Sequence, residues 1–432
     1  MTEPRHIPIR VPVLARVEGE GTLELRVRGK ALEEVRLRIF EPPRMFEKLL
    51  EGRDYAEVPD IVARICGICP AAYQMSAVHA IESLLGVDPG PWVRDLRRVL
   101  YCGEWMQSHS LHIHMLAAPD FLGYTAVTDM AREHSDEVRR GLKLQALGND
   151  IIRLLGARSV HPVGVRVGGF HHAPSRAQVD VLRDKLHAAQ ADAEALVRWT
   201  AAFDLPALEQ DFTVVALRHA QEYPMNTGRL VSSGGLDISI DRFETHFVEH
   251  QEPHSTALHC LHDGQPYLVG PLARLNLNLD RLPAPVRTVL ESTGIKFPSR
   301  NMYHSIVARA VEILLALHEA IRILEAYQEP PTPGVAVKPR AGTGYGCTEA
   351  PRGTLWHRYD FDADGKVTRA RIVPPTSQNQ ARIEADLRQA LQAYGLEHGD
   401  AALRQRGEMV IRNYDPCISC ATHFLDLRVR RD

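Results

Sequence analysis

The sequence predicts an α+β fold that is mainly helical, with a core of long helices and small β hairpins or sheets near the two ends of the chain. Near the N-terminus, and again over residues 355–372, apolar and polar side chains alternate as they do in strands with one buried face. In the middle, apolar residues recur every three to four positions. Of the 432 residues, 44% are hydrophobic, which allows a large core. No repeat or linker divides the chain, so we expect one domain.

The strands are predicted from two hairpin patterns. Residues 23–27 and 35–39 alternate apolar and polar side chains on either side of a turn at 28–30. Residues 355–372 repeat this alternation around Asp364-Gly365, a pair that favours a tight hairpin turn. We therefore expect one hairpin near each end of the chain.

The helices are predicted in the middle of the chain. Residues 179–196 carry an apolar stripe that follows a helix-start signal at Pro174-Ser175, and residues 306–324 carry a second stripe. Residues 92–116 and 131–155 mix charged with apolar side chains, so each should bury one stripe against its neighbours. These four segments should form the helical core.

The composition also bears on partners and location. A formal net charge of −3 gives no electrostatic reason to expect nucleic-acid binding. The sequence contains no run of 18 uncharged apolar residues, so we expect no membrane span. Residues 1–10 are polar and charged and lack the apolar region of a secretory signal, which indicates the cytoplasm.

Four of the seven cysteines form two C-x-x-C pairs, Cys66 with Cys69 and Cys417 with Cys420. Two intervening residues let both sulfurs of a pair face one metal ion, and soft thiolates select zinc, copper(I), iron–sulfur clusters or nickel. The remaining three cysteines are single, and we expect buried free thiols at Cys102, Cys260 and Cys347.

A structural zinc site is the commonest use of four cysteines in two pairs. Zinc ribbons, however, usually place the pairs about 15–20 residues apart, whereas nearly the whole chain separates these two. A redox C-x-x-C is expected near a βαβ pattern, which neither pair has. The spacing therefore favours a metal site other than structural zinc, with zinc as the alternative.

The two cysteine motifs resemble those of a known family. Residues 64–69 read R-I-C-G-I-C and residues 415–423 read D-P-C-I-S-C-A-T-H, similar to the two signature motifs of nickel–iron hydrogenase large subunits. The resemblance implies a single catalytic domain over residues 1–423 that cleaves dihydrogen. It also implies that all four thiolates bind nickel. Cys66 and Cys417 would be terminal nickel ligands. Cys69 and Cys420 would also bridge to an iron that carries carbon monoxide and two cyanides.

The resemblance also assigns catalytic roles. Glu18 lies in R-V-E-G, similar to the motif whose glutamate relays protons from the terminal cysteine, and Cys417 would be the base that accepts them. Arg352 lies in E-A-P-R-G, which resembles the family's arginine loop over the diatomic ligands and the open site. Thr376 lies where the family has a second cyanide-contacting segment.

A magnesium site and a removable tail are implied in the same way. Glu47 and His423 match the two side chains that bind magnesium in the family, together with a backbone carbonyl near residues 372–373. In the family, a nickel-dependent endopeptidase cuts after this histidine. Residues 424–432 would therefore be a cleavable C-terminal extension.

The chain departs from the membrane-bound branches at Tyr73, where they usually have histidine, and so looks like the cytoplasmic branch linked to NAD or NADP. It has no spare cysteine set for clusters and no G-x-G-x-x-G motif, so an iron–sulfur small subunit and flavin NAD(P)-reductase subunits are implied as partners. Three alternatives remain: a structural zinc protein, a metal-free relative resembling the quinone-site subunit of complex I, and a deazaflavin-reducing hydrogenase.

Overall fold

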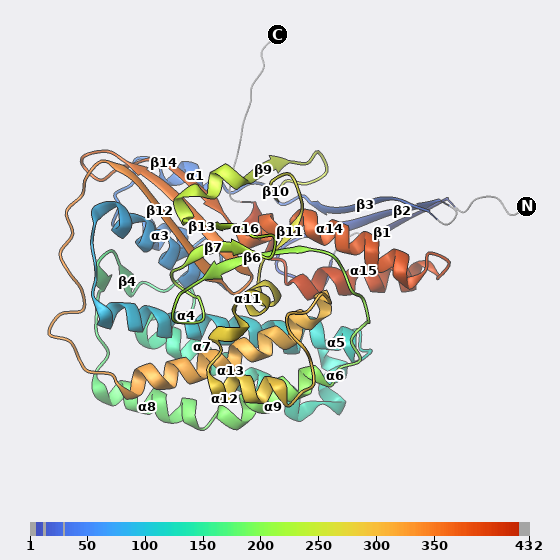
Figure 1. The fold of residues 1–432 in the computed structure, drawn as a ribbon, viewed down its shortest axis with the longest axis horizontal. Helices are drawn as coiled ribbons and strands as arrows, with labels where there is room; N and C mark the ends of the chain where they lie inside the picture. The colour runs from blue at the N-terminus through green and yellow to red at the C-terminus, as the bar shows by residue number, and fades with distance from the viewer. Residues whose placement is uncertain (1–5, 12–13, 29–30, 423–432) are drawn as a thin grey trace, which may run out of the picture.

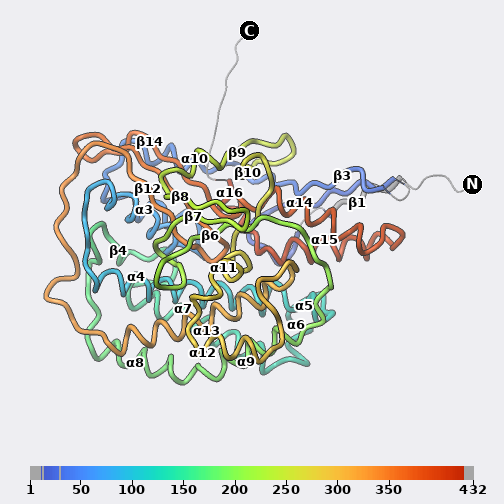
Figure 2. Tube along the Cα trace, in the orientation of Figure 1, coloured from blue at the N-terminus to red at the C-terminus, as the bar shows by residue number. Residues whose placement is uncertain are grey.

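The computed structural model describes residues 6–11, 14–28 and 31–422. Its helices form one large body, and most of the strands lie over one side of it (Figure 1). A sheet from the N-terminal residues extends from this body beside two helices from the C-terminal part of the chain, as the trace in Figure 2 also shows. The predicted α+β class with a mainly helical core is therefore confirmed.

The helical body is built around α4 (Pro91–Leu111), α7 (Ser135–Gly156) and α13 (Ser305–Glu325). Helix α4 packs against both of the others, and most residues of α13 are buried. The predictions of helices over 92–116 and 306–324 are confirmed, and that over 131–155 is confirmed from Ser135 onward, since a break at His134 separates α7 from α6 (Val127–Glu133). Their apolar stripes meet in the interior and supply the largest part of the hydrophobic core.

The predicted helix over 179–196 is in fact two helices, α8 (Arg176–His187) and α9 (Gln190–Ala201). Ser175 caps α8 in a capping box with Gln178, as the start signal predicted. The chain turns at residues 188–189. The apolar stripe continues across this turn because both helices bury their stripe against α13 and its neighbours. The periodicity therefore could not reveal the break.

Helix α4 does not simply end but widens into a π-helical turn, His112–Ala117, before α5 (Ala118–Phe121). Pro119 has no backbone N–H, so the hydrogen bond of an ordinary α-helical turn is lost there. Such π-turns are frequent at functional sites.

The predicted N-terminal hairpin is confirmed as β2 (Gly21–Arg28) and β3 (Ala31–Ile39), with Leu23 opposite Leu37. A further strand, β1 (His6–Val11), pairs with β2 and completes a three-stranded antiparallel sheet. Helix α14 (Pro375–Tyr394) covers this sheet by packing on β3.

The second predicted hairpin is confirmed as β13 (Gly353–Phe361) and β14 (Val367–Val373). The strand that pairs with β13 on its other side, β12 (Gly342–Ala350), was not predicted. Its three glycines weaken the strand pattern. They are needed because α3 (Pro70–Leu85) lies against the strand backbone: a Cβ at Gly346 would come within 2.0 Å of a carbonyl oxygen of α3. This contact fixes the helix that follows the first cysteine pair.

The middle of the chain adds a four-stranded sheet in the order β11-β6-β7-β8 and an antiparallel hairpin, β9–β10. These strands are β6 (Thr213–Arg218), β7 (Arg229–Ser232), β8 (Asp237–Ile238), β9 (Phe247–Gln251), β10 (Leu258–His262) and β11 (Tyr267–Leu268). A separate two-stranded sheet is formed by β4 (Val165–Arg166) and β5 (Gly169–Phe170). The other helices are α1 (Phe46–Leu50), α2 (Val58–Val62), α6 (Val127–Glu133), α10 (Phe243–His246), α11 (Pro271–Asn278), α12 (Ala284–Glu291), α15 (Asp400–Tyr414) and α16 (Ile418–Ala421). Within the described part of the chain, none of the helices combines the length and apolar character needed to cross a bilayer.

The close approach of α4 and α7 yields a prediction. A Cβ on Gly148 would lie 2.5 Å from the carbonyl oxygen of Gly103 and 2.6 Å from the amide nitrogen of Gln107. Alanine normally stabilises a helix by about 1 kcal/mol relative to glycine. Here we expect G148A to destabilise the protein by about 1–3 kcal/mol, because the two helices must move apart. Urea unfolding would measure the loss.

The control is G234A, since a Cβ on the exposed Gly234 meets only ordinary van der Waals contacts. A stability of G148A equal to or above that of the wild type would contradict the packing described for α4 and α7.

Candidate metal centre

The four paired cysteines meet at one buried point. Cys69 caps the N-terminus of α3 and Cys417 that of α16, which contains Cys420. The Sγ atoms of Cys66 and Cys417 are 3.4 Å apart, those of Cys69 and Cys420 3.7 Å, and all four lie within 4.8 Å of one another. The two ends of the chain thus supply one set of four sulfurs.

The first pair is shaped by its own backbone and by α4. The amides of Ile68 and Cys69 both point at the Cys66 sulfur, each 3.3 Å away. From α4, the Gln107 side chain donates to the Ile68 carbonyl. The Glu104 carboxylate accepts from the first amides of α3, at 2.6 and 3.0 Å. Helix α4 therefore holds both sides of the first pair.

Glu104 was not predicted from the sequence. It could have been noticed as an acidic residue in a predicted helix that buries an apolar stripe, because a buried carboxyl needs a specific partner. Burial raises the pKa of Glu104 to about 8. The group is therefore largely neutral at pH 7.

The second pair is held by three hydrogen bonds to two neighbouring residues, Thr376 and Glu18. Thr376, at the start of α14, accepts a hydrogen bond at 3.1 Å from the amide of Cys417. The carbonyl of Glu18 accepts from Ile418 at 3.1 Å, and its carboxylate accepts from Ser419, also at 3.1 Å. Glu18 therefore lies against the short segment between Cys417 and Cys420.

Arg352 lies on the turn between β12 and β13 and is only 3% exposed. Its guanidinium donates to the carbonyl of Asp415 at 2.7 Å and to the carboxylate of Asp415 at 3.0 Å. The third nitrogen, Nη1, is buried and has no partner in the described part of the chain. Asp415, which the sequence analysis gave no role, therefore orients this arginine beside the cysteines.

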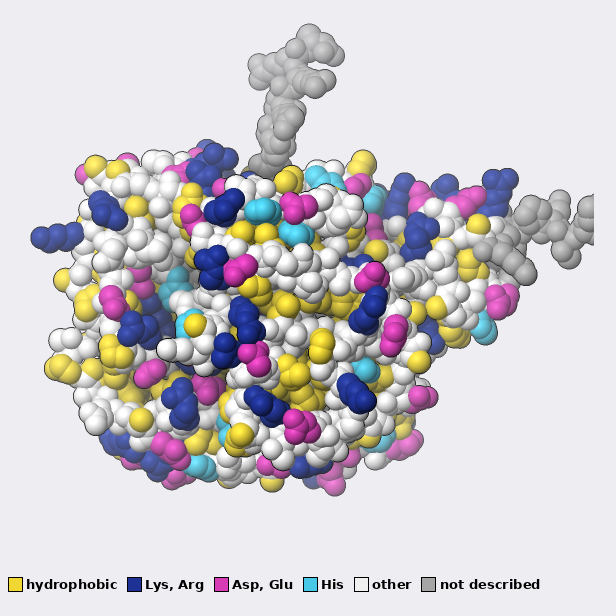
Figure 3. All heavy atoms as spheres, viewed as in Figure 1, with side chains coloured by type: hydrophobic (Ala, Val, Ile, Leu, Met, Phe, Trp, Pro, Cys, Tyr) yellow, Lys and Arg dark blue, Asp and Glu magenta, His cyan; other side chains and the backbone are white. Residues whose placement is uncertain are grey.

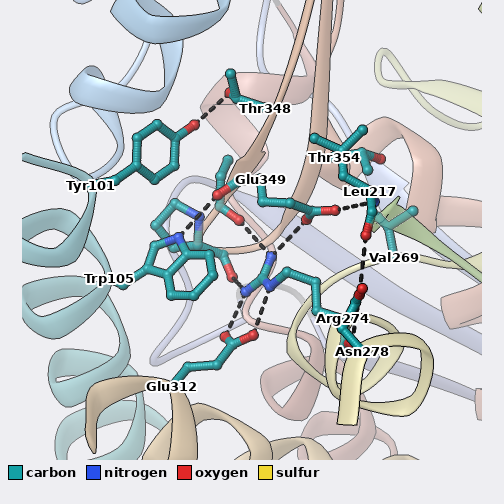
Figure 4. Close-up of polar contacts among 12 residues, drawn as sticks. Tyr101, Trp105, Leu217, Val269, Arg274, Asn278, Glu312, Thr348, Glu349 and Thr354 are labelled. Carbon is teal, nitrogen blue, oxygen red and sulfur yellow. Dashed lines mark hydrogen bonds and ion pairs between the residues drawn. The ribbon is translucent and has the colours of Figure 1, made fainter. Parts of the chain in front are cut away.

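A second buried arginine, Arg274, holds the turn that carries Arg352 (Figure 4). It donates to the carbonyls of Ala350 and Pro351, at 2.8 and 2.9 Å. It also pairs with the carboxylates of Glu312 and Glu349, at 2.7 and 3.0 Å. Arg274 was not predicted from the sequence. Its four partners lie 38 to 77 positions away along the chain, so no local pattern reveals them.

The residues expected at the magnesium site are only partly described. Glu47, on α1, accepts a hydrogen bond at 2.7 Å from the amide of Ile372, so it lies beside the strand whose carbonyl was expected to contribute. A second carboxyl, Glu249, lies nearby, and burial raises its pKa to about 8. The charge of Glu47 adds to this rise, whereas Arg371, which pairs with Glu249 at 3.4 Å, opposes it. His423 lies outside the described residues, as does the extension 424–432.

The histidines at the end of α4 and in the π-helical turn are held by hydrogen bonds within the protein. His109 donates to Glu312 at 2.9 Å, His112 to a carbonyl at 2.7 Å and His114 to a carbonyl at 2.9 Å. Burial lowers the pKa of each, so the rings are neutral. The interpretation that they are not ligands fits these contacts. The expected buried free thiols are confirmed for Cys102, Cys260 and Cys347.

Tyr73 lies on α3, one turn after Cys69, and is buried. Burial raises the pKa of its hydroxyl well above its usual value, and the neighbouring charge of Cys420 raises it further. The residue that departs from the membrane-bound pattern therefore borders the sulfur cluster.

The electrostatics of the cluster fit a soft metal. Burial raises the pKa of Cys417 and Cys420, whereas hydrogen bonds from their sulfurs lower the pKa of Cys66. Four thiolates cannot ionise together in a buried site unless a cation binds them. The donor set, all sulfur and closed off from solvent, therefore suits a soft metal ion, a class that includes nickel, iron and zinc.

Comparison with known proteins defines the class. A sequence profile described as nickel-dependent hydrogenase matches residues 44–143 and 241–423, which include all four clustered cysteines. The chain belongs to the nickel-dependent hydrogenase family, as a large subunit that binds nickel and iron and acts on dihydrogen as an oxidoreductase. This favours the nickel–iron interpretation over the structural zinc and metal-free alternatives.

Individual relatives span nearly the whole chain. It is 33% identical to sulfhydrogenase 2 subunit alpha of Pyrococcus furiosus, over 97% of this chain and 100% of that one. It is 28% identical to the NAD-reducing hydrogenase HoxS subunit beta of Cupriavidus necator, over 95% and 94%. An NAD+-reducing [NiFe]-hydrogenase in the H2-reduced state superposes with a TM-score of 0.87 at 27% identity, over 97% of this chain and 100% of that one. A [NiFeSe] hydrogenase of Desulfovibrio vulgaris Hildenborough, at 22% identity, shares the fold with a TM-score of 0.80, over 98% and 100%.

The Arg274 network predicts a pH dependence of stability. One guanidinium cannot neutralise two carboxylates, and burial raises the pKa of Glu349 from 4.5 to about 7. Because the folded state holds this proton more tightly than the unfolded state, stability falls as the pH rises from about 4.5 to 7. We expect the free energy of unfolding of E349Q to lack this loss. Over that pH range the difference in unfolding free energy between E349Q and the wild type should therefore shift by about 3 kcal/mol in favour of E349Q.

Urea unfolding of both proteins at pH 5 and pH 8 would measure the difference. Other titrating groups are common to both proteins and cancel in the comparison. A difference in stability that does not change with pH would contradict the raised pKa of Glu349.

Proposed function

We propose that this subunit cleaves dihydrogen reversibly and passes the electrons through an iron–sulfur small subunit, and then flavin-containing subunits, to NAD or NADP. The observation that carries the proposal is the convergence of four buried sulfurs with Glu18 and Arg352. Nickel and iron, when bound, supply the open coordination position at which dihydrogen is polarised. The protein then has to remove a proton and keep water away.

The proton route begins at Cys417, whose sulfur is the base in this proposal. Glu18 is the next carrier, because its backbone and carboxylate both lie against the segment that follows Cys417. A half-buried carboxyl beside a buried sulfur is suited to accept a proton and pass it on. The hydroxyl of Ser419 donates to Glu41 at 3.4 Å, which supports a continuation toward the surface.

The diatomic ligands are a finer part of the same proposal. We assign carbon monoxide and two cyanides to the iron, with Arg352 as donor to a cyanide. The unpartnered Nη1 of this buried guanidinium supports the assignment, since a buried N–H without an acceptor is costly. Thr376 is proposed as a second cyanide contact, although its hydroxyl already accepts from Cys417.

The proposal includes a magnesium ion bound by Glu47, His423 and a carbonyl near residues 372–373. The contact between Glu47 and Ile372, with the carboxyl of Glu249 nearby, supports a cation at this place, because magnesium prefers oxygen ligands. It also takes residues 1–423 as one catalytic domain and residues 424–432 as an extension that a maturation endopeptidase removes.

The electron acceptor is proposed from the relatives. Both the Cupriavidus protein and the superposed structure are described as NAD-reducing, which supports NAD or NADP over deazaflavin. The short strands β4 and β5, with His161 and Gly168 beside them, are proposed to face the small subunit's proximal cluster. We propose the cytoplasm as the location.

Metal analysis combined with infrared spectroscopy of the purified protein tests the metal assignment. We expect nickel and iron in equal amounts, with bands between about 1,900 and 2,100 wavenumbers from metal-bound carbon monoxide and cyanide, whose electronics the surrounding residues tune. Zinc at the four sulfurs with no bands in this window would contradict the proposal, once mass spectrometry has shown that residues 424–432 are absent.

Replacing Glu18 by glutamine tests the proton route. We expect E18Q to lower dihydrogen oxidation by about 10²- to 10⁴-fold, because an amide cannot carry the proton. Nickel and iron content should stay unchanged, since the glutamine oxygen can still accept from Ser419. The matched control is E20Q, which changes an exposed carboxylate in the same segment. Equal activities of E18Q and E20Q would refute the relay.

A further inference from the structure

The β9–β10 hairpin and its immediate flanks are rich in histidine, far along the chain from either cysteine pair. Figure 3 shows histidine side chains gathered over this hairpin at the molecular surface. The family assignment and the proposed proton route use none of them. The five are His246, His250, His254, His259 and His262.

Two of these histidines converge on a carboxylate from another element. His254 lies in the hairpin loop, His259 on β10 and Glu384 on α14, which packs against β10. The Nε2 atom of His254 is 2.8 Å from one oxygen of Glu384, and the Nε2 atom of His259 is 3.9 Å from the other. One ligand atom from each residue lies within 4.8 Å of the other two.

His259 is the unusual member. It is only 2% exposed, yet neither ring nitrogen has a hydrogen-bond partner in the described part of the chain. A buried polar group without a partner costs about 1–3 kcal/mol, so such groups normally have one. A neutral imidazole can bind a metal ion through the lone pair of one ring nitrogen.

The surroundings hold the carboxylate in place. The amide of Leu37, on β3, donates to Glu384 at 2.8 Å, and the amide of Thr256 in the hairpin donates to the Ile39 carbonyl at 2.8 Å. Contacts of this kind orient metal ligands and strengthen binding. The three side chains therefore lie where the N-terminal sheet, α14 and the hairpin meet.

We propose that His254, His259 and Glu384 bind a divalent ion of the zinc class, separate from the nickel–iron centre. Two imidazoles and one carboxylate are a recurrent zinc ligand set, and with bonds of about 2.0–2.2 Å the ligand atoms of a tetrahedral site lie roughly 3.3 Å apart. The two measured separations lie on either side of this value. Water takes the fourth position.

The ion has a structural consequence. It joins the hairpin to α14, whose first turn carries Thr376, the partner of the Cys417 amide. Glu384 follows Thr376 by eight positions, or about 12 Å of helix axis. A second group on the same hairpin consists of His246, His262 and Asp263. It is more exposed, and neither of its imidazole rings is fully buried, so we do not assign a site there.

Metal binding to the purified holoprotein tests the proposal, since nickel and iron already occupy the thiolates. Equilibrium dialysis against zinc should give one additional ion per chain. Cobalt(II) at the same site should show visible absorption typical of nitrogen and oxygen ligands, without the charge-transfer bands of thiolates. No additional ion, or a thiolate spectrum, would overturn the proposal.

Variants locate the ion. We expect E384Q and H254Q each to weaken zinc binding at least about tenfold, by analogy with the loss seen when metal-supporting residues are changed. The control is H187Q. His187 pairs with Glu325 at 3.0 Å, as His254 does with Glu384, but among the described residues no third metal-ligating side chain joins this pair. Circular dichroism would check folding, and H254Q serves if E384Q does not fold.

The second histidine group, His246 with His262 and Asp263, is the alternative location for the ion. If H262Q abolished zinc binding while E384Q and H254Q bound as tightly as the wild type, the ion would lie in that group and the proposal would be wrong. Binding lost in E384Q and H254Q but kept in H187Q and H262Q would establish the site.

Discussion

The structure depends on one constraint: four sulfurs from positions 351 residues apart must meet at a single buried point. Neither pair can hold its geometry alone. Helix α4 fixes the first pair through Gln107 and Glu104, while α14 and the segment around Glu18 fix the second. The long helices and the three-stranded sheets therefore act as a rigid frame around a site whose ligands they do not themselves provide.

Buried charge plays a similar positioning role around this frame. Arg274 holds the carbonyls of the turn that carries Arg352, and Arg352 in turn donates to Asp415, two positions before Cys417. Buried ion pairs contribute little net stability, because desolvation offsets their attraction. Their value here is geometric, since each guanidinium has several fixed donors and so allows the turn only one position.

Much of this was predictable from the sequence, for reasons that particular residues illustrate. The spacing within each cysteine pair is local, and the alternation on either side of Asp364-Gly365 is local too, so both were visible. Strand β12 was hidden by glycines that exist for contact with α3. Glu104 and Arg274 were hidden because a buried charge is explained only by partners distant in the sequence. The break between α8 and α9 left the apolar stripe unchanged.

The separation of the two cysteine pairs also affects how the protein is made. At translation rates of about 5–20 residues per second, roughly 20–70 s pass between the synthesis of Cys66 and that of Cys417. During that interval Cys66 and Cys69 are an incomplete chelator, open to oxidation and to any thiophilic ion in the cell. The complete set of four sulfurs therefore exists only after Cys420 has been made, so half of the metal site waits through most of synthesis for the other half.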